Sequence, residues 1–134
     1  MALFTRPAPI VPRQQHLPQQ VPIDAYGGGA GFRFADMAHP GSILSLPSGI
    51  YGWAPTSAAE ISRETLAALF AEADAVSVLV IGTGGDIAGL PADMRQALRE
   101  AGIGVEIMAT GPAVRTYNIL LAEGRPVAAA LIAP

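Results

Sequence analysis

The spacing of hydrophobic positions changes near residue 60, roughly halfway along the chain. Before that point, short stretches of alternating apolar and polar residues are separated by glycine and proline, as is typical of strands joined by tight turns. Beyond it, nearly continuous apolar runs alternate with segments of helical spacing. Such runs are typical of strands buried on both faces, and the intervening segments are typical of helices that cover a sheet. The pattern predicts an α/β fold.

The first half of the chain is predicted to consist of short strands and turns. Tyr26, the glycine-rich residues 27–31 and Phe32–Phe34 predict a hairpin. Ser42–Leu46 predicts a half-buried strand, and Gly49–Trp53 predicts a further one. A glycine run can also cradle a phosphate, but a phosphate loop uses the free amides of a following helix, and no helical pattern follows here. We therefore predict a turn.

The second half alternates three predicted strands with three predicted helices. The strands cover residues 76–81, 105–108 and 127–132, and the helices cover residues 62–72, 91–101 and 112–124. Ser62 is a candidate N-cap for the first helix, Pro91 and Gly102 delimit the second, and Thr110 or Gly111 is expected to cap the third. Because strand–helix–strand connections within one sheet are right-handed and parallel, this half predicts a parallel βαβαβ unit. The N-terminal strands form an additional β layer or extend the edge of the sheet.

The chain length of 134 residues fits one domain. Residues 1–21 are rich in proline and glutamine and predict a flexible arm, in which His16 is expected to be solvated. Residues 22–134 are predicted to form a single α/β domain. Prolines interrupt the apolar residues of the first twelve positions, so no secretory signal is predicted. The expected location is the cytoplasm in a bacterium and the mitochondrion in a eukaryote.

Composition narrows the classes of partner. A net charge of −3 lacks the basic surface that nucleic acid or an anionic membrane requires. The absence of cysteine excludes disulfides, thiol catalysis and thiolate metal sites. The longest apolar runs have the length of strands and are too short to span a bilayer. We therefore expect no binding to nucleic acid and no integral membrane segment.

The sequence contains no recognisable set of catalytic residues. A nucleophile triad needs a histidine to move the proton, and the only candidate, His39, lies in a predicted turn with Pro40 and Gly41. The carboxylates are scattered, and no spacing of histidines or acids is typical of a metal site. The sequence therefore favours a protein that is not an enzyme and that holds no metal or cofactor.

A glycine-rich loop offers an alternative function. Gly82, Thr83 and Gly84 open this loop directly after a predicted buried strand, and it continues through Asp86. A dinucleotide-binding turn has a third glycine at fixed spacing and opens directly into a helix, whereas here the third glycine is displaced and a proline delays the helix. Ligands nevertheless bind at the carboxyl ends of strands in open α/β sheets. The alternative is therefore a small-ligand or nucleotide-binding domain that uses this loop together with Arg115.

The predicted third helix has an apolar face and a polar face. Ala113, Tyr117 and Leu120 share one stripe and are expected to face the core. Arg115 and Asn118 are three residues apart and are therefore neighbours on another face. A guanidinium group offers a fixed fork of donors that matches a carboxylate or a phosphate, and the first turn of a helix adds free amides.

Two interpretations of the polar residues on this helix stay open, and they are compatible. Thr116 and Glu123 share one side of the helix, and Glu123 can pair with Arg115 or with Arg125 across the closing turn. In the first interpretation, an internal polar network fixes the helix to the sheet. In the second, the face that carries Arg115 and Asn118 docks a protein partner.

Four segments of the sequence resemble a known protein family. They are GSILSLPSGIYGW (41–53), VLVIGTG (78–84), GIGVEIMAT (102–110) and AVRTYNILLAEGRPVAAAL (113–131). The resemblance covers about residues 22–132, in order and without large gaps. The family consists of mostly uncharacterised bacterial and archaeal proteins, and its eukaryotic relatives include the third assembly factor of mitochondrial respiratory complex I and the adipogenesis-associated Mth-domain protein.

The resemblance implies a three-layer sandwich built on a mixed central sheet. It also implies a non-enzymatic assembly role, at least in the mitochondrial branch, with complex I subunits or assembly intermediates as partners. The residues that fall on the family motif are Trp53, Gly82, Gly84, Arg115, Thr116, Asn118, Glu123 and Arg125. Ala109 departs from the pattern, because relatives often carry an aspartate before the threonine; this departure weakens the case for a common ligand.

Self-association is a third hypothesis. The N-terminal strands are candidates for the edge of the sheet, and an exposed edge offers unpaired backbone groups to a second copy. The sequence leaves the oligomeric state open.

Overall fold

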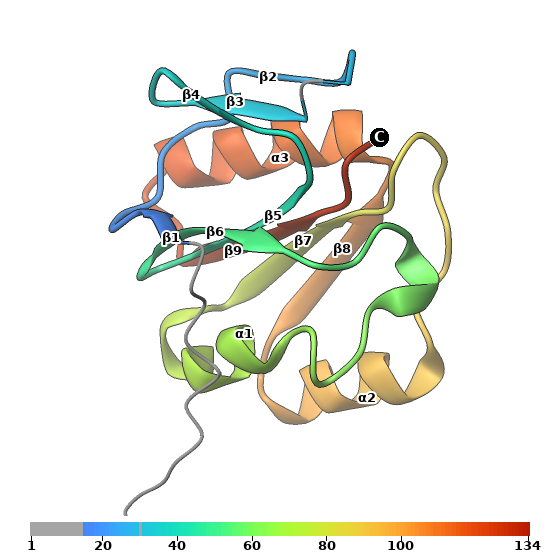
Figure 1. Cartoon of the computed structure of the whole chain (residues 1–134). Coiled ribbons are helices and arrows are strands. Elements are labelled where there is room, and N and C mark those ends of the chain that lie inside the picture. Colours follow the sequence, from blue (N-terminus) through green and yellow to red (C-terminus); the bar gives the residue numbers. More distant parts are fainter. Residues whose placement is uncertain (1–14, 30) are drawn as a thin grey trace, which may run out of the picture.

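The computed structural model describes residues 15–29 and 31–134 (Figure 1). Its larger sheet has six strands in the order β1-β6-β5-β9-β7-β8, and its smaller sheet has the order β2-β3-β4. The strands are β1 (Gln15–Leu17), β2 (Ala25–Tyr26), β3 (Phe32–Phe34), β4 (Met37–His39), β5 (Ser42–Leu46), β6 (Gly49–Trp53), β7 (Val78–Gly82), β8 (Gly104–Met108) and β9 (Val127–Leu131). The helices are α1 (Ala67–Ala71), α2 (Ala92–Glu100) and α3 (Thr110–Ala122), with 3₁₀ turns η2 (Ala58–Glu60) and η3 (Ala73–Ala75).

The C-terminal half forms the predicted parallel unit. Strand β7 lies between β8 and β9 and runs parallel to both. Leu79, Val80 and Ile81 are fully buried, as expected for a strand that is covered on both faces. Helices α2 and α3 connect these strands and lie on opposite faces of the sheet (Figure 1). The parallel βαβαβ part of the α/β prediction is confirmed.

The N-terminal half completes the large sheet with antiparallel strands. Strand β5 pairs with β6 on one side and with β9 on the other, which places β9 in the middle of a mixed sheet. The prediction that Ser42–Leu46 is half-buried is wrong, because all five residues are buried. Both serines have internal partners: Ser42 Oγ accepts a hydrogen bond from Ala133 N at 2.9 Å, and Ser45 Oγ lies 2.7 Å from Tyr117 Oη. A polar residue with such a partner is compatible with full burial.

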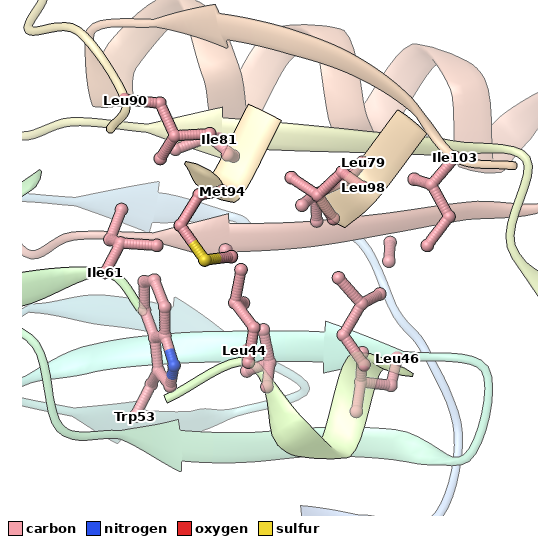
Figure 2. Packing of buried hydrophobic residues seen from close by; sticks show 14 of the residues in the cluster. Leu44, Leu46, Trp53, Ile61, Leu79, Ile81, Leu90, Met94, Leu98 and Ile103 are labelled. Atoms are coloured by element: carbon pink, nitrogen blue, oxygen red, sulfur yellow. The ribbon is translucent and has the colours of Figure 1, made fainter. Parts of the chain in front are cut away.

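Two hydrophobic clusters cover the two faces of the large sheet. One of them, shown in Figure 2, packs Trp53 and Ile81 against Met94 of α2. The other packs Phe32 and Phe34 of the small sheet against α3 and the opposite face of the large sheet. The small sheet is therefore the additional N-terminal β layer, on the same face as α3 (Figure 1). The predicted three-layer α/β sandwich is confirmed.

The helix predicted over residues 62–72 is shorter in the structure, where α1 begins only after Leu66. Ser62 caps a turn rather than the helix: its Oγ accepts a hydrogen bond from Thr65 N at 3.2 Å, and Thr65 Oγ1 accepts one from Ser62 N at 2.8 Å. The indole Nε1 of Trp53 donates to Thr65 O at 2.6 Å. Since a continuous helix would use this carbonyl as an acceptor four residues on, the tryptophan competes with helix formation.

The flexible arm predicted over residues 1–21 is wrong from Gln15 onward, and residues 1–14 lie outside the described residues. Strand β1 pairs antiparallel with β6, and Gln20 Nε2 donates to Val127 O at 2.8 Å. His16 is not solvated as expected, because its Nε2 lies 3.0 Å from Nδ1 of His39. Residues 15–21 are thus part of the folded domain.

Candidate functional site

Gly82, Gly84 and Thr110 form a buried junction between β7, α3 and β9. The hydroxyl of Thr110 donates to Ile132 O at 2.7 Å and accepts a hydrogen bond from Gly84 N at 2.9 Å. A backbone hydrogen bond joins the same two residues, Thr110 and Gly84, because Thr110 N donates to Gly84 O at 2.8 Å. The prediction that Thr110 or Gly111 caps α3 is therefore wrong: Ala109 occupies the N-cap position, and the threonine hydroxyl instead joins three elements of the fold.

Steric reasons explain why both of these positions, 82 and 84, carry glycine. A Cβ atom on Gly82 would lie 2.8 Å from Oγ1 and 2.9 Å from Cα of Thr110, so only glycine allows α3 to approach β7 so closely. Gly84 has a φ of +101°, a backbone conformation that side chains disfavour. These glycines therefore serve packing and chain direction.

Thr83 folds the glycine-rich loop onto the protein. Its backbone N donates to Met108 O at 2.9 Å. Its hydroxyl donates to Asp86 O at 2.7 Å and accepts a hydrogen bond from Ala88 N at 3.1 Å. The amides of Thr83 and Gly84 are thus bound within the chain, whereas a phosphate cradle needs free amides. This arrangement disfavours the alternative of a nucleotide-binding loop.

Tyr117 is the buried centre of a hydrogen-bond chain on the inner face of α3. Its hydroxyl donates to Val21 O at 2.9 Å and lies 2.7 Å from Ser45 Oγ. Because the single hydroxyl proton of Tyr117 goes to Val21, Ser45 is the donor in the second bond, and Gln20 Nε2 donates to Ser45 Oγ at 3.2 Å. Burial raises the pKa of Tyr117 to about 12, and the bond to Ser45 acts in the opposite direction. This hydroxyl is a structural group.

Asn118 is also occupied within the chain. Its Nδ2 donates to Ile23 O and its Oδ1 accepts a hydrogen bond from Ile23 N, both at 2.9 Å. The amide side chain thereby pairs with one backbone residue as a neighbouring strand would. Asn118 fixes the start of the small sheet to α3 and is not free for the docking contact that the sequence predicts.

The exposed face of α3 carries Arg115 and Ile119. Arg115 is exposed, and no carboxylate in the described part of the chain forms an ion pair with it. Ile119, one turn further, keeps 58% of its surface accessible. Thr116 is half-buried, with its hydroxyl 3.5 Å from Met108 Sδ. A cation beside an exposed apolar side chain, four residues apart, is a surface that can contact another protein.

The remaining predicted site residues lie elsewhere. Arg125 and Glu123 form an ion pair at 3.8 Å with both side chains 54% exposed, so the pair contributes little to stability. Trp53 is buried in the cluster with α2, on the opposite face of the sheet from α3. The sequence motif therefore does not define one site. Trp53, the two glycines and Asn118 maintain the fold. Glu123 and Arg125 are exposed but pair with each other, which leaves Arg115 as the candidate for contact with a partner.

Two features of the structure were not predicted from the sequence, and only one of them could have been recognised from the residue spacing. Ile119 follows Arg115 by four residues and lies outside the core stripe, so helical spacing alone could have identified its exposure. The contact between His16 and His39 could not be foreseen, because it joins β1 to the small sheet across 23 residues. Among the residues that the structure describes, no three histidines, aspartates or glutamates gather as a metal site.

Fold and site together define a three-layer α/β domain in which the motif residues Trp53, Gly82, Gly84 and Asn118 serve the fold, and whose third helix presents an exposed cation and an exposed isoleucine. The chain belongs to the family described as "Protein of unknown function (DUF498/DUF598)", whose model matches residues 23–132. This membership agrees with the resemblance that the sequence motifs show.

Two relatives illustrate the range of the family. An uncharacterised protein of Rhodobacter capsulatus is 39% identical over 92% of this chain and 93% of its own length. The mouse protein named NADH dehydrogenase [ubiquinone] 1 alpha subcomplex assembly factor 3 is 34% identical over 90% of this chain. The chain spans 65% of the length of that assembly factor.

Solved structures share the fold. A crystal structure described as an outer membrane protein from Bartonella henselae is 51% identical, with a TM-score of 0.84 over 88% of this chain and 98% of that one. The solution structure of a Bordetella pertussis protein, described as a Mth938-like domain, is 28% identical, with a TM-score of 0.71 over 98% of this chain and 92% of that one.

Proposed function

We propose that this protein is a non-enzymatic binding module that assists the assembly of respiratory complex I. The observation that carries the proposal is the similarity, over 90% of the chain, to proteins named as assembly factors of NADH dehydrogenase. Because the chain spans 65% of those proteins, the proposal concerns the activity of the shared domain. The partner is a complex I subunit or an assembly intermediate.

The proposed docking surface is the exposed face of α3. Arg115 provides donors that can pair with a carboxylate on the partner. Ile119 provides an apolar side chain that binding would remove from water. Neither side chain has a role in holding α3 to the sheet, since Tyr117, Asn118 and Thr110 do so. The surface can therefore be changed without unfolding the domain.

A deletion strain that carries plasmid copies of the protein tests the proposal. The double variant Arg115→Glu/Ile119→Asp should fail to restore NADH-dependent complex I activity and should no longer co-purify complex I subunits. Its free energy of unfolding should change by less than about 0.5 kcal/mol per substitution, as is usual at exposed positions. Urea denaturation of the purified variant checks this value.

The matched control is Arg63→Glu, which reverses an exposed charge on the opposite face of the sheet. Arg63 stacks on Phe70 with 5.6 Å from its Cζ to the ring centroid, so the change alters charge far from α3. This variant should restore activity in full. Intact complex I in the deletion strain itself would contradict the proposed role. An equal loss of complex I activity with Arg63→Glu would contradict the proposed docking surface.

The proposed location of this role is the bacterial cytoplasm, or the mitochondrion if the host is a eukaryote. Within residues 15–29 and 31–134, no helix combines the length and the apolar character needed to cross a membrane. Fractionation of the native host followed by immunoblotting tests the location. Recovery in the outer membrane, as the description of the Bartonella henselae relative would suggest, would contradict a cytoplasmic role.

A further inference from the structure

Strand β8 forms an open edge of the large sheet. It pairs with β7 and with no other strand of the described structure. In a parallel ladder, the backbone groups of alternate residues point to the same neighbour. Gly104 N donates to Ser77 O at 2.9 Å, and Met108 O accepts a hydrogen bond from Thr83 N at 2.9 Å. Gly104 and Met108 therefore direct their backbone groups at β7, and Val105 and Ile107 direct theirs away from the sheet.

The outward side of β8 adjoins two hollows in the surface. The first, of about 340 Å³, is lined by Ile87, Arg95, Val105 and Ile107, together with the two residues that follow Ile87. The second, of about 260 Å³, is lined by Arg95, Arg99, Val105 and the two residues before it. Because they share Arg95 and Val105, the two hollows follow one another along the strand. We call them the α2–β8 groove.

The α2–β8 groove combines apolar side chains with unpaired positive charge. Ile87 keeps 67% of its surface accessible, the largest exposed fraction among the described large hydrophobic residues. Arg95 and Arg99 are one helical turn apart and both exposed, so their guanidinium groups lie along the same wall. Neither pairs with a carboxylate within the described part of the chain. An occupant should therefore be extended, partly apolar and negatively charged.

Charge separates the possible occupants. A second copy that paired β8 with β8 would bring two sets of Arg95 and Arg99 together, and like charges oppose such an interface. Residues 1–14 of this chain contain two arginines and no acid, so their charge does not complement the groove. A segment of another protein with acidic residues does complement it.

We infer that the α2–β8 groove binds an extended acidic segment of a partner protein, which adds to the large sheet as a seventh strand beside β8. The outward N–H and C=O groups of Val105 and Ile107 pair with the backbone of the added strand. Arg95 and Arg99 bind its carboxylates, and its apolar side chains contact Ile87. This inference concerns a different surface from the α3 face and does not depend on a role in complex I assembly.

The probe is a labelled peptide about eight residues long, to match a typical strand. Glutamate and valine alternate at every second position, so that both kinds of side chain lie on the same face of the added strand, with threonine at the positions between them. Fluorescence anisotropy measures its binding to the full chain, and hydrogen exchange followed by NMR reports on backbone amides. The peptide should slow exchange at Val105 N and Ile107 N. The same peptide with every residue N-methylated should not bind, because it keeps the charges and loses all of its backbone donors.

The double variant Arg95→Glu/Arg99→Glu should bind the glutamate–valine peptide about tenfold more weakly or not at all. Arg115→Glu, which reverses a single charge on the α3 face, should bind it as the unmodified protein does. Thermal denaturation checks that all variants are folded.

Three results would overturn the inference. Equal binding of the N-methylated peptide would show contact without strand addition. Equal binding of a lysine–valine peptide would remove the role of the two arginines. Protection of Val105 N and Ile107 N without any peptide, together with a dimer in sedimentation, would assign the edge to a second copy.

Discussion

At the scale of single residues, the hydroxyl of Tyr117 shows which part of a site a sequence reveals. The helical stripe of Ala113, Tyr117 and Leu120 correctly predicts that the tyrosine faces the core. Its partners could not be predicted, because Ser45 and Val21 are 72 and 96 residues away. Periodicity fixes the direction of a side chain within its own element, whereas hydrogen-bond partners depend on the packing of distant ones.

Tyr117→Phe tests the stability contribution of this chain of hydrogen bonds. The change leaves the ring in place and removes the hydroxyl, so Ser45 loses its acceptor and Val21 O loses its donor. The free energy of unfolding should fall by about 1–3 kcal/mol, the usual cost of a buried polar group without a partner. Urea denaturation at neutral pH measures the difference, and a loss below about 0.5 kcal/mol, the usual scale of surface changes, would argue against a role in stability.

The contact between His16 and His39 responds to pH. The pKa of His39 lies below its ordinary value of 6.5, because burial disfavours the charged ring and His16 repels it, while a hydrogen bond with the backbone of Ser42 acts in the opposite direction. The unfolded chain therefore takes up a proton at a higher pH than the folded chain does. The stabilisation from neutral His39 is fully present above pH 6.5 and is lost as the pH falls below that value.

Urea denaturation between about pH 7.5 and about pH 5.5, where histidine titrates, should show this loss. The free energy of unfolding should decrease toward the acidic end in the unmodified protein. In His39→Gln the slope should be smaller, because the titrating ring is gone. An identical slope in both proteins would assign the pH dependence to other groups.

At the scale of elements, predictions that rested on local sequence signals were correct, whereas those that depended on contacts with distant residues were wrong. Helix α2 lies where Pro91 and Gly102 predict it, because both residues act on their own backbone. Helix α1 is shorter than predicted, and the carbonyl of Thr65, which a longer helix would use, accepts a hydrogen bond from Trp53, which lies outside its segment. The burial of β5 could not be predicted for the same reason, since its serines bind Ala133, just beyond β9, and Tyr117 of α3 rather than solvent.

The close approach of α3 to β7 can be tested at Gly82. In Gly82→Ala the new methyl group would lie within 3 Å of Thr110, so the helix must shift and the free energy of unfolding should fall by about 1–3 kcal/mol. Gly85→Ala is the matched control, because a Cβ atom there meets nothing within 4 Å. Thermal denaturation of both variants compares them, and equal melting temperatures would show that the contact is easily relaxed.

At the scale of the whole molecule, alternation of strand and helix was enough to predict the parallel half of the sheet, and the family resemblance supplied the mixed three-layer arrangement. The hydrophobic pattern could not predict the order of strands, because that order depends on pairings between separate segments. Strand β1 pairs with β6, and β5 pairs with β6 and β9. The arm was misjudged because proline and glutamine are usual in disordered segments, whereas here Gln20 binds both Ser45 and Val127.

Truncation measures how far residues 15–21 belong to the domain. A chain that begins at residue 22 loses strand β1, the side chain of Gln20 and the carbonyl that accepts the Tyr117 proton. Relative to a chain that begins at residue 15, its free energy of unfolding should be lower by about 2 kcal/mol or more, because buried groups lose their partners. Equal urea midpoints for the two chains would show that these residues are accessory.

The place of β9 in the sheet has a consequence for biosynthesis. Its neighbours β5 and β7 are made well before it, yet each keeps one edge unpaired until residues 127–131 have left the ribosome. The nascent polypeptide therefore exposes two apolar strands, each with one unpaired edge, until β9 is available. Such exposed edges favour chaperone binding and aggregation during translation. The large sheet is therefore completed only after residues 127–131 have been made, rather than by gradual growth from the N-terminus.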